Sequence, residues 1–397
     1  MNFKFMPATV FFNRTNVLIN FRFLLLFIIY LLYGQLSFAQ LEAVNWYFGH
    51  NCALNFSQGN PVMINKSAMQ VTEGCTSISD SRGNLLFYTN GVTVWNKNHK
   101  MMRNGKGLKG HDSSTQSAIA IPKPGSAHLY YLFTSDAGAY DSPPNVGVHY
   151  SLIDMRRDTG LGEVIEKNFK LLPAAAEKLT AVKHSNGSDI WVMAHGWNTN
   201  NFYAWLVTRN GVSAPVMSSA GTIHFGGHSR DANSIGQMKF SPDGKRIALT
   251  MFDSKFFEVF DFNNTTGEVT NPHMIYTPDE DVAYGLEFSP NGEYLYVGIY
   301  WKKNIMQYEV NHPSGAQIMN SGALVGTTND IKLGSFQLAP DGRIYITKHS
   351  SYLGVINYPN NKGTSSQYED HGLLIRNGEL QLGLPGFIQS YFYKPNP

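Results

Sequence analysis

Short runs of alternating apolar and polar residues, separated by turn residues, cover most of the chain. In 240–249, two apolar runs flank the sequence Ser-Pro-Asp-Gly. Proline fixes φ at the first central position of a turn, and Asp-Gly accepts a tight bend with positive φ. Alternation on both sides of such a turn predicts a β-hairpin. The same pattern recurs in 288–297 and 338–346.

Three weaker copies of the hairpin come earlier, in 79–88, 121–133 and 183–192. The six turns follow one another at intervals of roughly 40 to 60 residues, which is the range of four-stranded propeller blades. After each hairpin the chain gives a loop, an alternating strand, a turn and a last strand. The turn glycines are Gly83, Gly125, Gly187, Gly244, Gly292 and Gly342.

The two ends of the chain complete the pattern. Three strands are predicted at 45–48, 53–56 and 61–64, and one at 384–392. Three strands plus one make a further blade, and a shared blade removes the open edge of the ring. We therefore predict an all-β fold: a single seven-bladed β-propeller of four-stranded antiparallel blades over 40–397, with the C-terminal strand innermost in the shared blade.

The first 39 residues have a different character. Basic residues, among them Arg22, precede an apolar run at 23–33, and Ser37 and Ala39 offer small side chains to a signal peptidase. This predicts a secretory signal peptide over 1–39, cleaved after Ala39, and an exported protein (periplasmic, outer-surface or extracellular) with no membrane span after cleavage. The alternative is an uncleaved anchor, although the run is short for a span of about 20 residues.

Composition narrows the function classes. The net charge is +2, and Lys and Arg are scattered, so no nucleic-acid partner is predicted. Hydrophobic residues make up 43% of the chain, enough for a packed core. The cysteines outside the signal peptide, Cys52 and Cys75, either pair in an oxidising compartment or lie as two small buried residues. A monomer is expected.

Several segments resemble a known family. They are 45–49, 73–80, 83–96, 113–118, 177–182, 383–385 and 389–392. They resemble the N-terminal propeller region of secreted Bacteroidetes surface proteins and, more distantly, YVTN-type, quinoprotein-amine-dehydrogenase-like and WD-repeat-like propellers. Such proteins often continue into PKD-type modules and a type IX sorting domain. This sequence ends at Pro397, directly after the predicted closing strand, so attachment by that route is not expected. The resemblance implies no catalytic residues.

Motifs for catalysis or cofactors are scarce. The sequence holds no Gly-x-Ser-x-Gly, His-Glu-x-x-His or P-loop pattern. The oxygen-rich stretch 261–267 suggests calcium, but it lacks the terminal bidentate Glu of an EF-hand, and a strand-connecting turn explains it as well. No cofactor is predicted, with calcium as the alternative.

Propeller geometry places the candidate site. The Pro-Asp-Gly turns lie on one face, whereas the loops into each first strand and between second and third strands converge on the opposite face, around the channel mouth. The candidate ligand-binding residues there are Glu73, Gln116, Glu177, His195, Trp197, Arg230, Asp253, Asp281, Trp301, Asp330 and His349. Further polar residues of these loops are His50, Asn90, Asp136 and Asp231. The alternative for each is a structural hydrogen bond to backbone or water.

The residue types suggest three functions. Trp197 and Trp301 suit a sugar ring or a peptide, and the carboxylates suit a cation or a basic group. The sequence therefore favours a non-enzymatic binding module for a protein or glycan partner. The alternative is a propeller hydrolase or lactonase, or a metal-dependent enzyme, in which His195, Glu177 and Asp253 converge for acid–base work. A third hypothesis is a structural component of the cell envelope.

Overall fold

The computed structural model describes residue 1 and residues 40–64, 66–138, 146–227, 232–376 and 378–395. The predicted signal peptide, apart from Met1, lies outside the described residues, and so do Arg230 and Asp231. Residues Gln40–Pro397 form one compact unit. None of the helices in the described ranges has the length and apolar character needed to cross a membrane.

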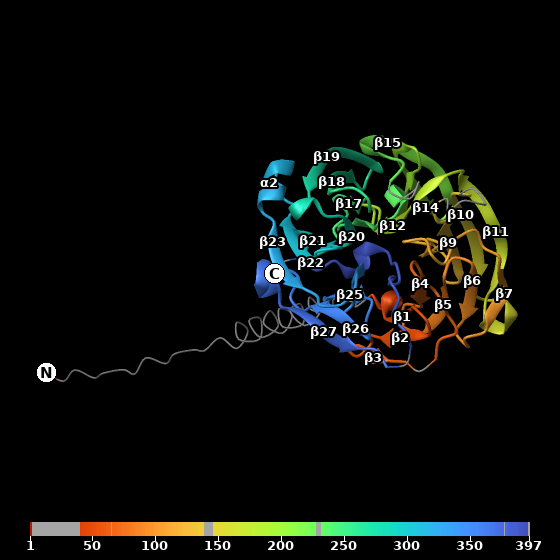
Figure 1. Cartoon of the computed structure of the whole chain (residues 1–397). Coiled ribbons are helices and arrows are strands. Elements are labelled where there is room, and N and C mark those ends of the chain that lie inside the picture. Colours follow the sequence, from red (N-terminus) through yellow and green to blue (C-terminus); the bar gives the residue numbers. More distant parts are fainter. Residues whose placement is uncertain (2–39, 65, 139–145, 228–231, 377, 396–397) are drawn as a thin grey trace. The chain divides into compact units, whose positions relative to one another are not determined.

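The described strands of this unit form six sheets around a common centre (Figure 1). The first contains β1 (Asn45–Phe48), β2 (Cys52–Asn55) and β3 (Val62–Met63). The second contains, in spatial order, β4 (Thr76–Ser79), β5 (Leu85–Thr89), β6 (Thr93–Asn96), β7 (Met101–Lys106), β11 (Glu163–Leu172), β10 (Val148–Asp154), β9 (Leu129–Ser135) and β8 (Ala118–Pro122). The all-β prediction is confirmed.

The other four sheets have four strands each, in chain order. They are β12 (Ala175–Lys183), β13 (Ile190–Gly196), β14 (Thr199–Thr208) and β15 (Gly211–His224); β16 (Met238–Phe240), β17 (Arg246–Thr250), β18 (Phe256–Asn263) and β19 (Glu268–Tyr276); β20 (Ala283–Phe288), β21 (Tyr294–Ile299), β22 (Asn304–Glu309) and β23 (Ala323–Thr327); and β24 (Leu333–Leu338), β25 (Ile344–Lys348), β26 (Tyr352–Ile356) and β27 (Tyr368–Leu374).

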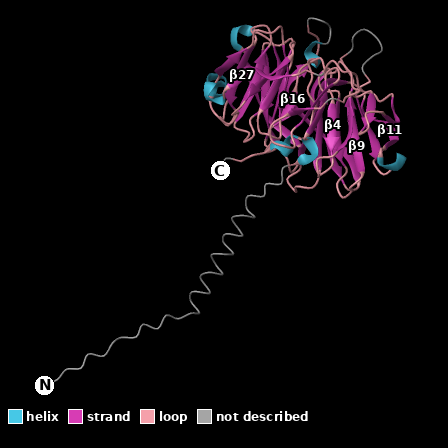
Figure 2. Cartoon of the chain, turned by 90° about the horizontal axis from the view of Figure 1, so that it is seen from below, coloured by secondary structure: helices cyan, strands magenta, loops and turns pink. Residues whose placement is uncertain are grey.

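Short helices lie in the connections. They are η1 (Leu41–Ala43), η2 (Asp158–Gly160), η3 (Ala232–Ser234), η4 (Pro278–Glu280), α2 (Gly315–Asn320), η5 (Gly363–Ser366) and η6 (Gln389–Phe392). Figure 2 shows that strands dominate and helices stay at the margins.

The eight-stranded sheet joins two four-stranded halves by their outer edges. Its only parallel pair is β7 with β11, where Glu163 lies opposite Arg103. Their side chains form an ion pair at 3.4 Å. All other neighbours in this sheet are antiparallel, so the halves repeat the pattern of the separate four-stranded sheets.

The predicted hairpins are confirmed. Gly244 and Gly292 have φ of +71° and +77°, the region that glycine adopts without strain. In the first turn the Ser241 amide donates to the Arg246 carbonyl at 2.9 Å. The Ser241 hydroxyl also donates to the Asp243 carboxylate at 2.6 Å. Local turn chemistry therefore fixes where β16 ends and β17 begins.

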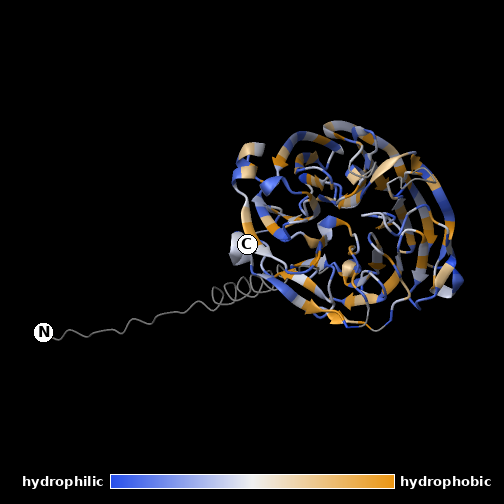
Figure 3. Ribbon diagram, viewed as in Figure 1, coloured by the Kyte–Doolittle hydropathy of each residue, from blue (hydrophilic) through white to orange (hydrophobic). Residues whose placement is uncertain are grey.

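The core lies between the sheets. Hydropathy alternates along many strands, as the orange and blue bands in Figure 3 show. Trp46, Phe133 and Trp205 are among the largest fully buried side chains, and each such burial stabilises the fold by about 1.5–3 kcal/mol. Cys52 and Cys75 are buried in this core as free thiols, so the structure has no bridge between them.

The C-terminal segment differs from the prediction. The structure has no regular strand over 384–392; Pro385 and Ile388 form isolated parallel bridges with Cys75 and Ala181, and η6 follows. Pro385 has no N–H to donate to a ladder, and its pairing with Cys75 stays an isolated bridge. Dark blue in Figure 1, the segment lies at the centre of the ring instead of forming an edge-paired strand.

We call residues 379–394 the central segment. Its hydrogen bonds join successive parts of the ring: the Leu382 amide donates to the Thr72 carbonyl at 2.9 Å, and the Gly386 amide to Cys75 at 2.8 Å. Further on, the Lys394 amide donates to Pro290 at 3.0 Å. Thr72 precedes β4, whereas Pro290 lies in a Pro-Asn-Gly turn. The central segment therefore runs from the face of the loops to the face of the turns.

Candidate functional site

Two glutamates of the candidate set lie together where the loops converge. We call this side of the ring the loop face and the opposite side, with the Pro-Asp-Gly turns, the turn face. Glu73 precedes β4, and Glu177 lies in β12. The amide and hydroxyl of Thr115 donate to Glu177 Oε2 at 2.8 and 2.9 Å. The Thr115 hydroxyl also interacts with Glu73, so one threonine links both carboxyl groups.

Each carboxyl group has further partners. The Tyr284 hydroxyl donates to Glu73 Oε2 at 3.1 Å, and the Gly138 amide donates to Glu177 Oε1 at 2.7 Å. Glu177 is fully buried, whereas Glu73 keeps some contact with solvent. Three N–H and O–H donors aimed at Glu177 favour its ionised form. Glu73 is thus the more exposed member of the pair.

Burial, followed by the charge of Glu177, raises the pKa of Glu73 to about 8. Burial also raises the pKa of Glu177, against the donors from Gly138 and Thr115. Burial and the charge of Glu177 both disfavour ionisation of Glu73, so Glu73 keeps its proton at neutral pH. A carboxyl group with a pKa near the working pH is suited to general acid–base catalysis.

A buried basic cluster lies behind Glu177. Burial lowers the pKa of the next residue, Lys178, to about 7, and its ammonium group donates to the carbonyls of Ser234 and Ile235 at 2.9 and 3.1 Å. His195 stacks on His224 with ring centroids 3.7 Å apart. Burial lowers the pKa of His195 to about 3 and that of His224 well below its usual value.

The expected convergence of His195, Glu177 and Asp253 is not what the described residues show. His195 is neutral and buried, and its Nδ1 contacts the Gly196 carbonyl at 2.8 Å. No hydrogen bond between described residues joins it to Glu177, and Asp253 is exposed beyond the end of β17. Because protonating a histidine costs free energy in such an apolar site, His195 serves packing.

Other candidate residues hold the loops in place. Gln116 is buried and exchanges two hydrogen bonds with the Met238 backbone, at 2.8 and 2.9 Å. Asp281 accepts from the amides of Val282 and Lys302 at 2.7 and 2.6 Å. The contacts of Gln116 and Asp281 are therefore the structural hydrogen bonds to the backbone that the alternative interpretation expected. Trp197 is half-buried, and His349 is exposed.

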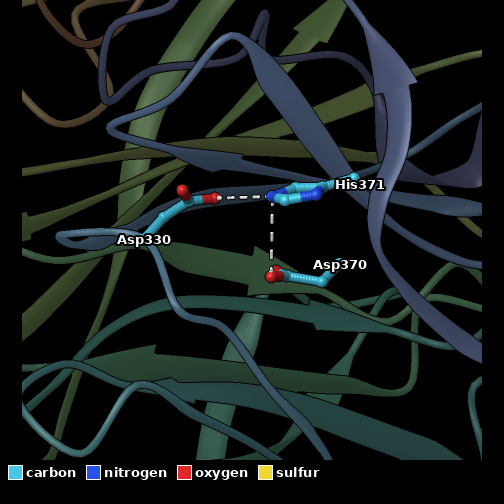
Figure 4. Close-up of side chains that lie close together, drawn as sticks. All are labelled: Asp330, Asp370 and His371. Atoms are coloured by element: carbon cyan, nitrogen blue, oxygen red, sulfur yellow. Dashed lines mark ion pairs between the residues drawn. The ribbon is translucent and has the colours of Figure 1, made fainter.

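Asp330 belongs to a separate cluster at the last sheet (Figure 4). Ligand atoms of Asp330, Asp370 and His371 lie within 4.8 Å of one another, close enough to bind a metal ion. The ammonium group of Lys348, however, lies 2.6 and 2.7 Å from the two aspartates. This buried cation offsets one of their two negative charges, and the cluster is an ion-pair network in the described structure.

The calcium prediction concerned 261–267. There Asp261 pairs with Arg246 at 3.0 Å and accepts from Asn271 at 2.7 Å. Asn263 accepts from the amides of Thr265 and Thr266. These contacts are those of a strand-connecting turn, and calcium at this turn stays a prediction.

A cleft of about 410 Å³ opens on the turn face, beside the Asp243 and Asn291 turns. Its polar groups largely satisfy one another: Arg246 pairs with Asp261 at 3.0 Å, and Lys245 with Asp243 at 3.4 Å. It lies opposite the glutamate pair. Asp261, from the candidate calcium stretch 261–267, is among the residues that line it.

Sequence reasoning missed Thr115, Tyr284 and Gly138. Thr115 directly precedes Gln116, and Tyr284 lies in the first strand of its sheet, so both occupy positions comparable to residues that were named. Their contacts join loops that are far apart in the sequence. A single threonine or tyrosine carries no local signal for such contacts.

Comparison with known proteins gives the fold class. No protein-family model matches the chain, and a sequence search of curated proteins found no match. Among solved structures, a candidate 6-phosphogluconolactonase from Bacteroides fragilis superposes with a TM-score of 0.53 at 12% identity, covering 86% of this chain and 96% of its own. The periplasmic gluconolactonase PpgL of Pseudomonas aeruginosa gives 0.50 at 12% identity, covering 85% and 97%.

A third solved structure is the β-propeller domain of Cps50 (Swd1) from Myceliophteria thermophila, with a TM-score of 0.44 at 12% identity, covering 79% of this chain and 92% of its own. The two closer superpositions show a shared fold at low sequence identity. Together with the sheets around a common centre, they show that this chain has a β-propeller-type fold.

Proposed function

We propose that the protein is a propeller hydrolase that opens a cyclic ester, with Glu73 as the general base. The observation that carries the proposal is the Glu73–Glu177 pair on the loop face, with the pKa of Glu73 raised to about 8. Two structures of similar fold have lactonase names, which supports the choice of reaction class. Both observations favour the lactonase alternative over the binding module.

The reaction needs one proton acceptor near a carbonyl carbon. The Glu73 carboxylate takes a proton from water as the water oxygen attacks the lactone carbonyl. The acyl C–O bond then breaks, and the proton moves from Glu73 to the departing ring oxygen, which leaves as a hydroxyl group. The Tyr284 hydroxyl donates a hydrogen bond to Glu73 and holds it in place. Burial and the charge of Glu177 keep the pKa of Glu73 at about 8, close to neutral pH.

Steady-state hydrolysis of glucono-1,5-lactone and 6-phosphogluconolactone tests the proposal. We expect Glu73→Gln to lower kcat by a factor of about 100 or more, the size of a general-base contribution. The rate of the enzyme should rise with pH to a plateau above about 8, after subtraction of the spontaneous reaction. Glu268→Gln is the control, because Glu268 is an exposed carboxylate at the start of β19 that accepts from the Thr266 hydroxyl at 2.9 Å, away from the loop face.

A lactone turnover that Glu73→Gln leaves intact would refute the role of Glu73. Turnover of neither lactone would return the protein to the binding-module hypothesis, with a protein or glycan partner on the loop face.

We also infer seven blades. The eight-stranded sheet divides at its parallel β7–β11 contact into two four-stranded units, and four further sheets have four strands each. β1–β3 and the central segment would supply the seventh blade, whose His50 and Glu379 amides donate to each other's carbonyls at 2.9 Å. Export, cleavage after Ala39 and a monomeric state belong to the same proposal.

A further inference from the structure

A row of aromatic rings leads from the surface of the loop face to the glutamate pair. Trp301 is 67% exposed, and its ring lies 4.8 Å from that of Tyr300. Tyr300 contacts Phe252 at 4.9 Å, and Phe252 contacts Tyr284 at 6.1 Å. The Tyr284 hydroxyl donates to Glu73. The row therefore joins an open aromatic side chain to the proposed general base.

The backbone around Trp301 is fixed. Asp281 Oδ1 accepts from the Trp301 amide at 3.4 Å, and Oδ2 accepts from Lys302 at 2.6 Å. The edge-to-face contact with Tyr300, which is buried, then holds the indole from one side. An exposed tryptophan held in this way loses little conformational freedom on binding, so it is suited to act as an anchor.

Charged groups of both signs lie in the loops that carry this anchor and its contacts Phe252 and Asp281. Lys302 pairs with Asp279 at 3.7 Å, and Lys255 pairs with Glu280 at 2.5 Å; all four side chains are more than half exposed. Balanced donors and acceptors beside an aromatic face suit a neutral ligand with many hydroxyl groups. An aromatic ring covers the C–H face of a pyranose, and the charged groups accept from or donate to its hydroxyl groups.

We propose that Trp301, held from behind by the buried aromatic row, forms a platform for a pyranose ring of a neutral oligosaccharide. This rests on the proposed lactone hydrolysis for the identity of the reacting end: the preferred substrate would be an oligosaccharide that ends in a lactone ring. The lactone reaches Glu73, and the preceding sugar rings lie toward Trp301.

Binding is measured by isothermal titration with maltotetraose, cellotetraose and mannotetraose as probes. Glu73→Gln serves as the host, so that binding is read without turnover. We expect at least one probe to bind, Trp301→Ala to weaken that binding about tenfold, and Trp301→Phe to retain most of it. Tyr358→Ala is the matched control, since Tyr358 is a similarly exposed aromatic side chain that follows β26 on the turn face.

Kinetics separate this inference from the proposed function. With the aldonolactones of maltose and cellobiose, Trp301→Ala should raise KM about tenfold and leave kcat unchanged, while the KM for glucono-1,5-lactone stays the same. Lactone turnover without any effect of Trp301→Ala on KM or on probe binding would overturn the platform. Binding of a tetrasaccharide that depends on Trp301, without turnover of any lactone, would support the platform and refute the hydrolase. No binding of the three probes would overturn the platform and favour a protein partner at Trp301.

Discussion

Gly383→Ala tests how tightly the central segment is held against the site. A Cβ at Gly383 would lie 1.7 Å from the carbonyl oxygen of Glu73 and 2.2 Å from its carbonyl carbon. Real Cβ atoms do not approach backbone this closely, and neither atom belongs to a flexible side chain. The methyl group must therefore push the central segment away from the strand that begins after Glu73.

The cost can be worked from the contacts at this point. Moving the segment strains three hydrogen bonds: Leu382 to Thr72 at 2.9 Å, Ser335 to Leu382 at 2.8 Å, and Thr347 to Leu382 at 2.6 Å. At about 1 kcal/mol each, their loss amounts to about 3 kcal/mol. Overpacking adds about 1–3 kcal/mol. We expect the free energy of unfolding to fall by about 4–6 kcal/mol.

Urea denaturation followed by tryptophan fluorescence measures this loss. Gly386→Ala is the matched control in the same segment, because its Cβ would meet only ordinary contacts, at 3.6 and 3.8 Å. The control should change the free energy of unfolding by less than about 0.5 kcal/mol.

Equal stability of the two variants would refute the inference that the central segment packs tightly against Glu73. If this packing holds, Gly383→Ala should also lower lactone turnover, because it displaces the general base.

Three further predictions concern buried charge. The pKa of Glu73 is raised from 4.5 to about 8, so between pH 4.5 and 8 the native state binds more protons than the unfolded state. The contribution of Glu73 to stability therefore falls as pH rises through this range. Glu73→Gln should remove this pH dependence in urea titrations at pH 5 to 8. The pKa of Lys178 is lowered from 10.5 to about 7, so its contribution rises with pH between those values, and Lys178→Met should flatten that rise. Lys348→Met leaves Asp330 and Asp370 without their cation and should cost about 2–4 kcal/mol, with partial recovery in millimolar calcium that the wild type does not show.

Glu73→Gln and Lys348→Met each have a defined contrary result. A pH dependence that Glu73→Gln leaves unchanged would mean that other carboxyl groups dominate that window. A Lys348→Met variant as stable as wild type would show that the aspartates do not depend on the ammonium group. Equal stabilisation of wild type and Lys348→Met by calcium would mean that the ion binds elsewhere.

The hairpins could be predicted because their causes are local. Gly244 and Gly292 accept positive φ, and the residues around them place apolar side chains on one side of each strand. The same reasoning found β1–β3 at the N-terminal end. Where it failed, at 384–392, the apolar pattern was right, and Leu384 and Ile388 are buried. There the backbone pairing is limited to isolated bridges, one of them at Pro385, which has no N–H to donate.

The site was only partly predictable. Glu73 and Glu177 were named because propeller geometry brings their loops to one face, and the structure joins them through Thr115. Gln116 was named for the same reason, yet its amide group satisfies the Met238 backbone. Whether a polar side chain faces a ligand or a backbone group depends on contacts between loops far apart in the sequence, which one sequence does not encode locally.

The central segment also sets the order in which the protein folds. The bond from the Thr76 hydroxyl to the Gly386 carbonyl spans 310 residues, whereas Met238 pairs with Leu249 across a single turn. Closing the longer loop costs about 3 kcal/mol more chain entropy than closing the hairpin. Contacts of such high sequence separation form late and slow the search for the native state. Each sheet can therefore form early by itself, whereas the carboxylate pair gains its final surroundings only when the last part of the chain reaches the centre of the ring.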